Sequence, residues 1–261
     1  MNKHPAWPYP RVLAHRGGGV LAPENTLGAI RTGIAHGFRA VEFDAMLPAD
    51  DTPILMHDPT LARTAGRTGA VTDFKAAELA QFDVGRWHSP AFAGEPVPTL
   101  EQTLALCRRE GVWANVEIKP APGREAATGR MVALQVARAF SDQLRPGGDR
   151  QESAVPGVPL LSSFSIEALI AARDAVPDLP RGWLVDRVPG DWRPRLDELG
   201  CVALHTNQRH LTASLAAAVK DAGIWLFCYT VNEPGRAREL LGWGVDAFCT
   251  DRIDLIGPDF A

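Results

Sequence analysis

The chain has 261 residues, of which 46% are hydrophobic and 22% are charged, so its composition is typical of a globular protein and excludes a disordered or fibrous one. A formal net charge of −4 argues against nonspecific binding to nucleic acid, which normally requires a basic excess. The four cysteines form no CxxC pair, so we expect them to be reduced and buried. The sequence predicts no secretory signal and no membrane-spanning run, and we therefore expect a cytoplasmic protein without stable membrane association.

Eight short apolar runs recur along the chain and are predicted to be β-strands. They cover residues 12–15, 40–47, 113–119, 158–164, 182–185, 201–206, 224–231 and 245–250. Helical patterns lie between them, such as the spacing of Leu27, Ile30 and Ile34 or the capping box of Thr99 and Gln102. Strands that alternate with helices indicate a parallel sheet. Eight such units favour a closed (β/α)8 TIM barrel over an open doubly wound sheet, for which a GxGxxG loop would be expected.

Two stretches interrupt this alternation. Residues 59–98 are too long for an ordinary connection, and we expect them to form a small insertion after the second strand, over one mouth of the barrel. Residues 1–261 are then expected to form one TIM-barrel domain that contains this insertion. Residues 145–159 form a polar loop rich in proline and glycine, to which we assign no function.

Acidic side chains gather in the second and third predicted strands. Glu42 and Asp44 are two residues apart, so the alternation of a strand directs both side chains to one face. Glu117 and Lys119 share a face for the same reason. Buried like charges repel, and a divalent cation relieves that repulsion; oxygen ligands without cysteine favour Mg²⁺ or Ca²⁺. The alternative is that these acids pair with arginine and lysine side chains at the strand ends.

Two of the seven histidines lie at predicted strand ends. His15 ends the first strand beside Arg16, and His57 follows a short apolar run that prolongs the second strand. Two imidazoles at one mouth can supply a general acid and a general base near neutral pH. Zinc ligation of the amidohydrolase kind is the weaker alternative, because Arg16 and Gly17 stand where a His-x-His pair would be needed. We expect His36 to be a surface residue near a helix end, and His4, His88 and His210 to lie in loops.

The residues in these strands, with several others, resemble the glycerophosphodiester phosphodiesterase family. The segments that carry the resemblance are HRG at 15–17, PENT at 23–26, EFD at 42–44, HDPTLART at 57–64, VPTLE at 97–101, NVEIK at 115–119, TVN at 230–232, GVD at 244–246 and TD at 250–251. They follow one another over almost the whole chain, which makes the resemblance specific. Tyr229 stands where the family usually has tryptophan, and Arg252 stands where proline often follows, so the departures concern substrate preference rather than activity.

The resemblance implies a (β/α)8 barrel with a small insertion after its second strand. It also implies metal-dependent hydrolysis of a small glycerophosphodiester to glycerol 3-phosphate and an alcohol such as choline or ethanolamine. The implied site residues are Glu42, Asp44 and Glu117 for one divalent ion (Mg²⁺ or Ca²⁺), His15 and His57 for acid–base catalysis, and Arg16 and Lys119 for the phosphate. No GxSxG elbow and no poised serine or cysteine is present, so we expect the substrate's own 2-hydroxyl to attack and form a cyclic phosphate.

Three points stay open on the sequence alone. Trp225 and Phe227 alternate on the seventh predicted strand and form either an apolar wall of the substrate pocket or part of the barrel core. A lipid phosphodiesterase of the phospholipase C or D kind is an alternative on the same barrel, although the sequence contains no basic amphipathic helix for membrane docking. A phosphodiester-binding module without activity is a second alternative, but such a module does not need an acid–base pair.

Overall fold

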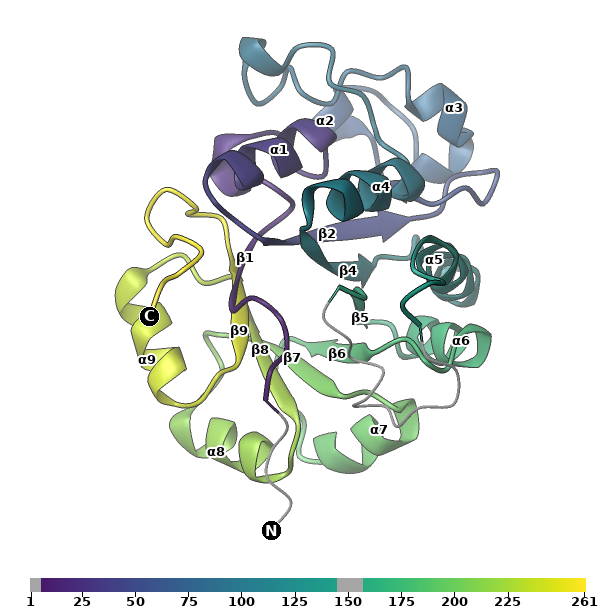
Figure 1. The fold of residues 1–261 in the computed structure, drawn as a ribbon. Coiled ribbons are helices and arrows are strands. Elements are labelled where there is room, and N and C mark those ends of the chain that lie inside the picture. Colours follow the sequence, from purple (N-terminus) through teal and green to yellow (C-terminus); the bar gives the residue numbers. More distant parts are fainter. Residues whose placement is uncertain (1–5, 145–156) are drawn as a thin grey trace.

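The computed structural model describes residues 6–144 and 157–261. Eight parallel strands form a barrel, which closes because β1 pairs with both β9 and β2 (Figure 1). Their bounds are β1 Val12–Ala14, β2 Ala40–Met46, β4 Trp113–Ile118, β5 Leu160–Ser163, β6 Arg181–Val185, β7 Ala203–Asn207, β8 Trp225–Tyr229 and β9 Ala247–Thr250. The short strand β3 (Ile54–Leu55) pairs antiparallel with β2. All eight predicted strands are present, and the predicted (β/α)8 barrel is confirmed.

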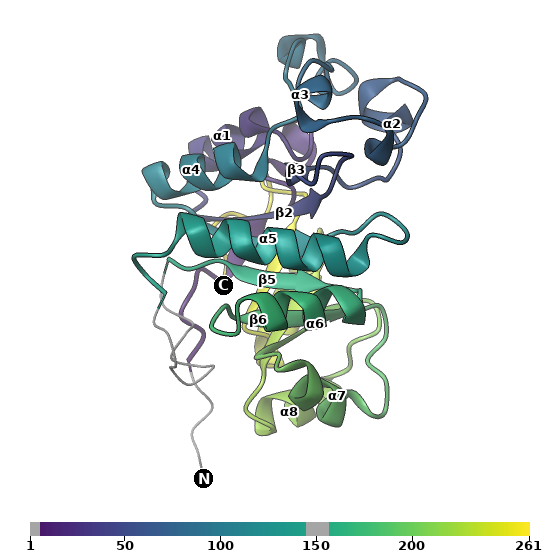
Figure 2. The same ribbon diagram turned by 90° about the vertical axis from the view of Figure 1, so that its right-hand side faces the viewer.

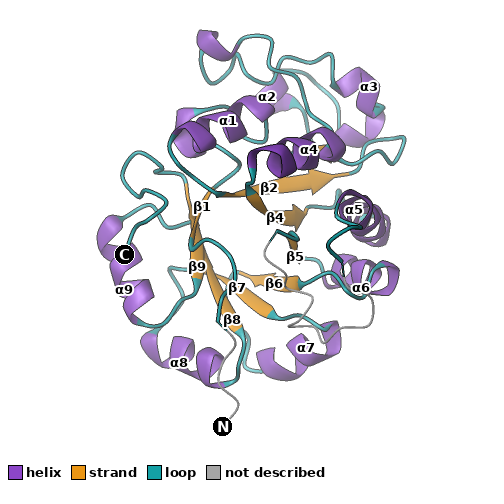
Figure 3. Ribbon diagram, viewed as in Figure 1, coloured by secondary structure: helices purple, strands orange, loops and turns teal. Residues whose placement is uncertain are grey.

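The longer helices surround the barrel on its outside (Figure 3). They are α1 Leu27–Ala35, α4 Leu100–Glu110, α5 Glu125–Ala139, α6 Ile166–Ala175, α7 Trp192–Leu199, α8 Ala213–Asp221 and α9 Pro234–Gly242. At the start of α1 the Thr26 hydroxyl accepts from the amide of Ala29, and at the start of α4 Thr99 forms the predicted capping box with Gln102. Within the described ranges, no helix is both long and apolar enough to cross a bilayer.

Strand alternation separates two apolar layers. Odd-numbered residues of β2, such as Val41 and Phe43, point outward and pack with the helices in the main core. Inward-facing residues such as Leu13, Trp113 and Trp225 fill the barrel interior in a second cluster. The four cysteines are free and buried, as expected from their spacing. Because the odd residues of β2 face outward, its even residues Glu42 and Asp44 face into the barrel.

Residues 59–98 contain only short elements, α2 (Ala62–Ala65), α3 (Ala76–Leu79) and three-residue 3₁₀ turns. Figures 1 and 2 show α2 and α3 on one side of the barrel, close to α1 and α4. A separate apolar cluster lies under this segment and includes Met46 of β2. The carboxylate of Glu95 accepts a 2.6 Å hydrogen bond from the amide of Gly28 and so ties the segment to α1. Of the loop predicted at 145–159, residues 145–156 lie outside the described residues.

Candidate active site

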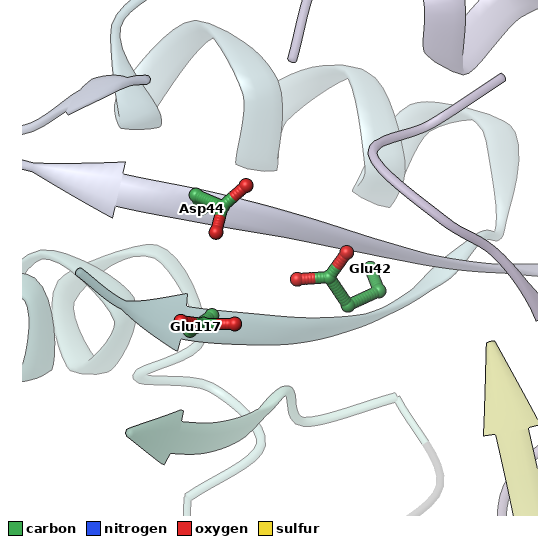
Figure 4. A group of neighbouring side chains, drawn as sticks. All are labelled: Glu42, Asp44 and Glu117. Carbon is green, nitrogen blue, oxygen red and sulfur yellow. The ribbon is translucent and has the colours of Figure 1, made fainter. Parts of the chain in front are cut away.

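Three carboxylates meet where β2 and β4 run side by side. Asp44 is directly opposite Glu117 in the parallel register, and Glu42 lies one inward position earlier on β2. One oxygen of each carboxylate lies within 4.8 Å of the others, and Figure 4 shows the three side chains facing one another. The relative exposures of Glu42 and Asp44 are 4% and 1%. The sequence prediction that these three acids share one face is therefore confirmed as geometry.

The three carboxyl groups differ in their electrostatic surroundings. Burial, together with the charge of Asp44, raises the pKa of Glu42 to about 7 and that of Glu117 to about 8. Burial also acts to raise the pKa of Asp44, but Arg16 at 3.5 Å and Lys119 at 3.6 Å outweigh it, so the pKa of Asp44 falls below its ordinary value. The cations of the chain therefore stabilise the ionised form of Asp44, whereas ionisation of Glu42 and Glu117 is unfavourable.

These acids fit a hard divalent cation. Pairing with arginine and lysine, the alternative from the sequence, accounts for Asp44 and in part for Glu117, which lies 2.9 Å from the Lys119 ammonium. It does not account for Glu42, whose Oε1 is buried without a hydrogen-bond partner among the residues described. A carboxylate oxygen without a partner lies beside two other carboxylates, and the group contains no cysteine. Such a set of oxygen ligands matches the preference of Mg²⁺ or Ca²⁺.

His15 follows β1, and its imidazole contacts an acid from near the carboxyl terminus of the chain. Its Nδ1 is 2.5 Å from Asp251, which in turn accepts a 2.9 Å hydrogen bond from the amide of Asn232. Its Nε2 is 3.6 Å from Glu42. Burial acts to lower the pKa of His15, but Asp251 and Glu42 outweigh it, and the pKa lies above its ordinary value. The imidazole is thus fixed between a supporting acid and the carboxylate cluster.

His57 is held in the same way from the other side of the mouth. Its Nδ1 is 2.6 Å from Asp58, which is bound at 2.6 Å by Arg63. Arg63 is also 2.5 Å from Glu24, and Glu24 accepts a 2.7 Å hydrogen bond from Arg16. The hydrogen bond from Arg63 is the main reason that the pKa of Asp58 falls to about 2. Burial lowers the pKa of His57, so its imidazole is neutral near pH 7.

One histidine can therefore donate a proton while the other accepts one. In each, an aspartate engages Nδ1, which leaves Nε2 as the nitrogen available for transfer. Arg16 and Lys119 both lie within 4 Å of Asp44, so two cations border the same cluster. Arg16 adopts a left-handed backbone with φ of 51°, and its amide donates to Glu42. Acids, imidazoles and cations from separate strands are brought together at the carboxyl end of the barrel, where TIM-barrel enzymes carry their sites.

The structure does not bring Trp225 and Phe227 to this mouth. Trp225 is the first residue of β8 and packs at 5.4 Å from Trp7, at the amino end of the barrel. Phe227 lies in the middle layer, where its ring stacks on His205 at 4.5 Å. Both side chains lie in the buried apolar cluster inside the barrel. Strand alternation fixes the face of a side chain but not its height in the barrel, so the sequence pattern left this open. Tyr229, two residues later, is the aromatic residue of β8 at the carboxyl end of the strand.

Several residues at the site received no role from the sequence. The acids Asp58 and Asp251 orient the histidines, and the side chain of Asn25 donates at 2.8 Å to Asp44. Tyr229 stacks edge-on against the exposed ring of Phe164 at 5.7 Å. Asp58, Asp251 and Asn25 belong to segments that carry the family resemblance, so the sequence could have pointed to them. Phe164 lies outside those segments, and the sequence did not point to it.

Comparisons with known proteins agree with this geometry. A sequence model described as the "Glycerophosphoryl diester phosphodiesterase family" matches residues 15–255. A glycerophosphodiester phosphodiesterase from Caldanaerobacter subterraneus is 27% identical over 92% of this chain and 93% of the relative. A second, from Bacillus subtilis, is 28% identical over 93% of this chain and 84% of its own. The solved structure of an Oleispira antarctica phosphodiesterase, in complex with its product sn-glycerol-3-phosphate, superposes with a TM-score of 0.81 and 32% identity over 93% of both chains.

Proposed function

The chain belongs to the glycerophosphoryl diester phosphodiesterase family and is a phosphoric diester hydrolase, and we propose that it hydrolyses glycerophosphodiesters to glycerol 3-phosphate and an alcohol. The observation that supports this most strongly is the meeting of three acids, two oriented imidazoles and two cations at one barrel mouth. The relative from Oleispira antarctica binds the same product at 32% identity. The proposed substrate is a small molecule rather than a macromolecule.

The metal is proposed to be one Mg²⁺ or Ca²⁺ ion held by Glu42, Asp44 and Glu117. When bound, such an ion acts as a Lewis acid that stabilises negative charge on phosphoryl oxygens. The chain adds two positive charges of its own from Arg16 and Lys119, which lie at the border of the acid cluster. We propose that these two side chains bind the non-bridging phosphate oxygens and favour the more highly charged transition state.

His15 and His57 are proposed to divide the proton transfers between them. One Nε2 removes the proton of the attacking hydroxyl, and the other donates a proton to the alkoxide of the departing alcohol. Asp251 and Asp58 act as positioning residues, because each holds Nδ1 of its histidine and so fixes which ring nitrogen takes part. After the first step the two histidines have exchanged protonation states, and the second step restores them.

The attacking oxygen is proposed to be the 2-hydroxyl of the substrate's glycerol. It forms a bond to phosphorus as the bond to the alcohol breaks, which gives a five-membered cyclic phosphate that water then opens. A phosphodiester built on propane-1,3-diol lacks this hydroxyl and should be hydrolysed at least about a hundredfold more slowly, because effective molarities of intramolecular attack are large. Equal rates for the two compounds would mean that water attacks directly.

The reaction itself is tested with a panel of glycerophosphodiesters and coupled detection of glycerol 3-phosphate. Choline, ethanolamine and glycerol esters should release glycerol 3-phosphate, and chelation should stop the release. A lysophospholipid in the same panel tests the alternative lipid phosphodiesterase, and faster hydrolysis of that lipid would favour it. Release of glycerol, rather than glycerol 3-phosphate, would contradict the proposed position of cleavage.

A further inference from the structure

A cavity of about 420 Å³ adjoins the proposed catalytic centre. His15 and Asp251 line it on the barrel side, the loop after β1 contributes Val20, and Trp87 and His88 line it from the segment 59–98. His15 therefore belongs both to this cavity and to the carboxylate cluster, from which its Nε2 is 3.6 Å away. A substituent of a phosphate bound at the centre could therefore extend into this cavity.

The walls of the cavity are fixed by direct contacts. His88 Nε2 donates a 3.0 Å hydrogen bond to the carbonyl of Val20, which joins the segment 59–98 to the loop after β1. The amide of Val20 donates at 2.8 Å to the carbonyl of Asp251. Gly19 has a φ of 54°, and a Cβ there would lie 2.1 Å from that same carbonyl. The cavity is thus formed before a ligand arrives, which lowers the entropy cost of binding.

Large apolar side chains line the cavity together with charged ones, among them Arg16 and Glu24. Val20 and Trp87 are 51% and 43% exposed, which is high for large apolar side chains. Glu24, which also lines the cavity, already accepts from Arg16 and Arg63. The Trp87 indole nitrogen donates to the carbonyl of Val84. The carboxylates of Glu24 and Asp251 are engaged within the protein, so a group without hydrogen-bond donors fits the cavity better than a polyol does, and the cavity suits the other half of a glycerophosphodiester.

Trp87 also separates this cavity from a second one. The second cavity is lined by Arg63 and Trp87, and Arg63 lies over the indole ring at 5.8 Å. Arg63 does not line the first cavity, in which the ring of His88 meets Trp87 edge-on at 5.8 Å. Trp87 is 43% exposed, so a cation in the first cavity can reach its ring, and tryptophan binds cations on its face better than the other aromatic residues. A quaternary ammonium carries charge without any hydrogen-bond donor, as this surface requires.

We propose that this cavity binds the departing alcohol and that Trp87 selects a quaternary ammonium group on that alcohol. The inference rests on the proposed function, because it names the alcohol of the same reaction. Trp87 is a specificity-determining residue, and Val20 supplies the apolar surface for the methyl groups. A primary ammonium, such as that of ethanolamine, needs acceptors that are already engaged, so it is the poorer ligand.

The test compares two esters of equal shape: glycerophosphocholine and its neutral analogue, in which carbon replaces the nitrogen (the 3,3-dimethylbutyl ester). Choline is also the better leaving group, so the informative quantity is the change in the ratio of kcat/KM between variants. Trp87→Ala should lower the choline preference about fivefold, as expected for a partly desolvated cation–π contact. Trp87→Phe should lower it about twofold and guards against misfolding of the alanine variant. Phe164→Ala, an equally exposed aromatic residue at the same mouth, should leave the ratio unchanged.

An unchanged ratio in both Trp87 variants, with the esters still hydrolysed, would overturn this inference and leave the proposed function intact. Failure of the wild type to hydrolyse any ester would overturn both. Free choline should in addition inhibit the wild type more strongly than 3,3-dimethylbutanol, and this difference should disappear in Trp87→Phe or Trp87→Ala. Stronger inhibition by the neutral alcohol would show an apolar pocket without cation selection and would overturn the inference.

Discussion

The two ends of the barrel use the same strands for opposite purposes. β4 carries Trp113 at its amino end and Glu117 near its carboxyl end, and β8 begins with Trp225 and ends with Tyr229. At the amino end, Tyr9 stacks on Trp113 with ring centroids 4.0 Å apart, and Trp7 packs edge-on against the tryptophans. This end is a closed aromatic core, of the kind that contributes most of the free energy of unfolding.

The carboxyl end holds buried like charges instead. The raised pKa values of Glu42 and Glu117 mean that ionisation of these groups disfavours the folded state in the absence of a cation. An arrangement that costs stability yet brings acids, imidazoles and cations together is typical of a site selected for function. The same strands therefore contribute stability at their amino ends and functional side chains at their carboxyl ends. The following substitutions separate the two ends.

The largest effect is expected at the acid cluster. Glu117→Gln should lower kcat/KM on the order of 10³-fold, because a metal ligand is lost. The free energy of unfolding of the metal-free protein should be equal to or above that of the wild type, because a carboxyl group whose ionisation disfavours the fold is removed. The matched control is Asp246→Asn, at the amino end, where the carboxylate binds Lys220 at 2.5 Å and the amide of Leu226 at 2.7 Å. That variant should lose stability and keep its kcat. Equal losses of activity in the two variants would contradict the separation.

Trp225→Ala should destabilise the protein by about 3–5 kcal/mol, because it opens a cavity in the aromatic core. Its kcat/KM should be unchanged at temperatures below the unfolding transition. Thermal unfolding and steady-state kinetics on the same preparation measure both quantities. A selective change in KM without loss of stability would place Trp225 in the substrate pocket and refute its assignment to the core.

His57→Ala should lower kcat by about 10²-fold or more, because a general acid or base acts in the transition state. Unfolding of the variant should remain close to that of the wild type, since the imidazole is only partly buried. His36→Ala is the control: this exposed residue at the end of α1 should affect neither quantity. Near-normal kcat in His57→Ala would remove His57 from the mechanism.

A smaller effect, on the pH dependence of the free energy of unfolding, is expected from His205 inside the barrel. Burial lowers the pKa of His205 to about 3, and its ring stacks on Phe227. In the unfolded chain the group binds a proton below about pH 6.5, whereas the folded protein does not, so its contribution destabilises the fold as pH decreases from 6.5 toward 3. His205→Phe should remove about 1 kcal/mol per pH unit of this dependence, measured by denaturant unfolding between pH 7 and pH 5. An unchanged slope would contradict the assignment of a neutral, buried imidazole.

The sequence predicted the barrel well because its strands and capped helices have strong local patterns. The acid cluster could also be predicted, since Glu42 and Asp44 alternate within one strand and Glu117 lies on the neighbouring one. The helices α2 and α3 were not predicted, because four residues are too short for a hydrophobic period to appear. The role of Trp225 stayed open, because height in a barrel depends on the registers of neighbouring strands.

Long-range side-chain pairs were likewise beyond the sequence. The contact between His15 and Asp251 joins residues 236 positions apart, and the contact between Glu24 and Arg63 spans 39. Their partners are set by barrel closure and by the placement of the segment 59–98, neither of which local patterns specify. The cavity beside Trp87 depends on the same placement and was also not predicted.

Removal and return of the metal test most directly whether the carboxyl end of the barrel is a metal-dependent phosphodiesterase site. Exhaustively chelated protein should hydrolyse glycerophosphocholine at background rate. Titration with Mg²⁺ or Ca²⁺ should restore turnover as one ion binds per chain by calorimetry, and Glu117→Gln should bind that ion much more weakly. Full turnover by chelated protein, with no metal found by elemental analysis, would contradict the account.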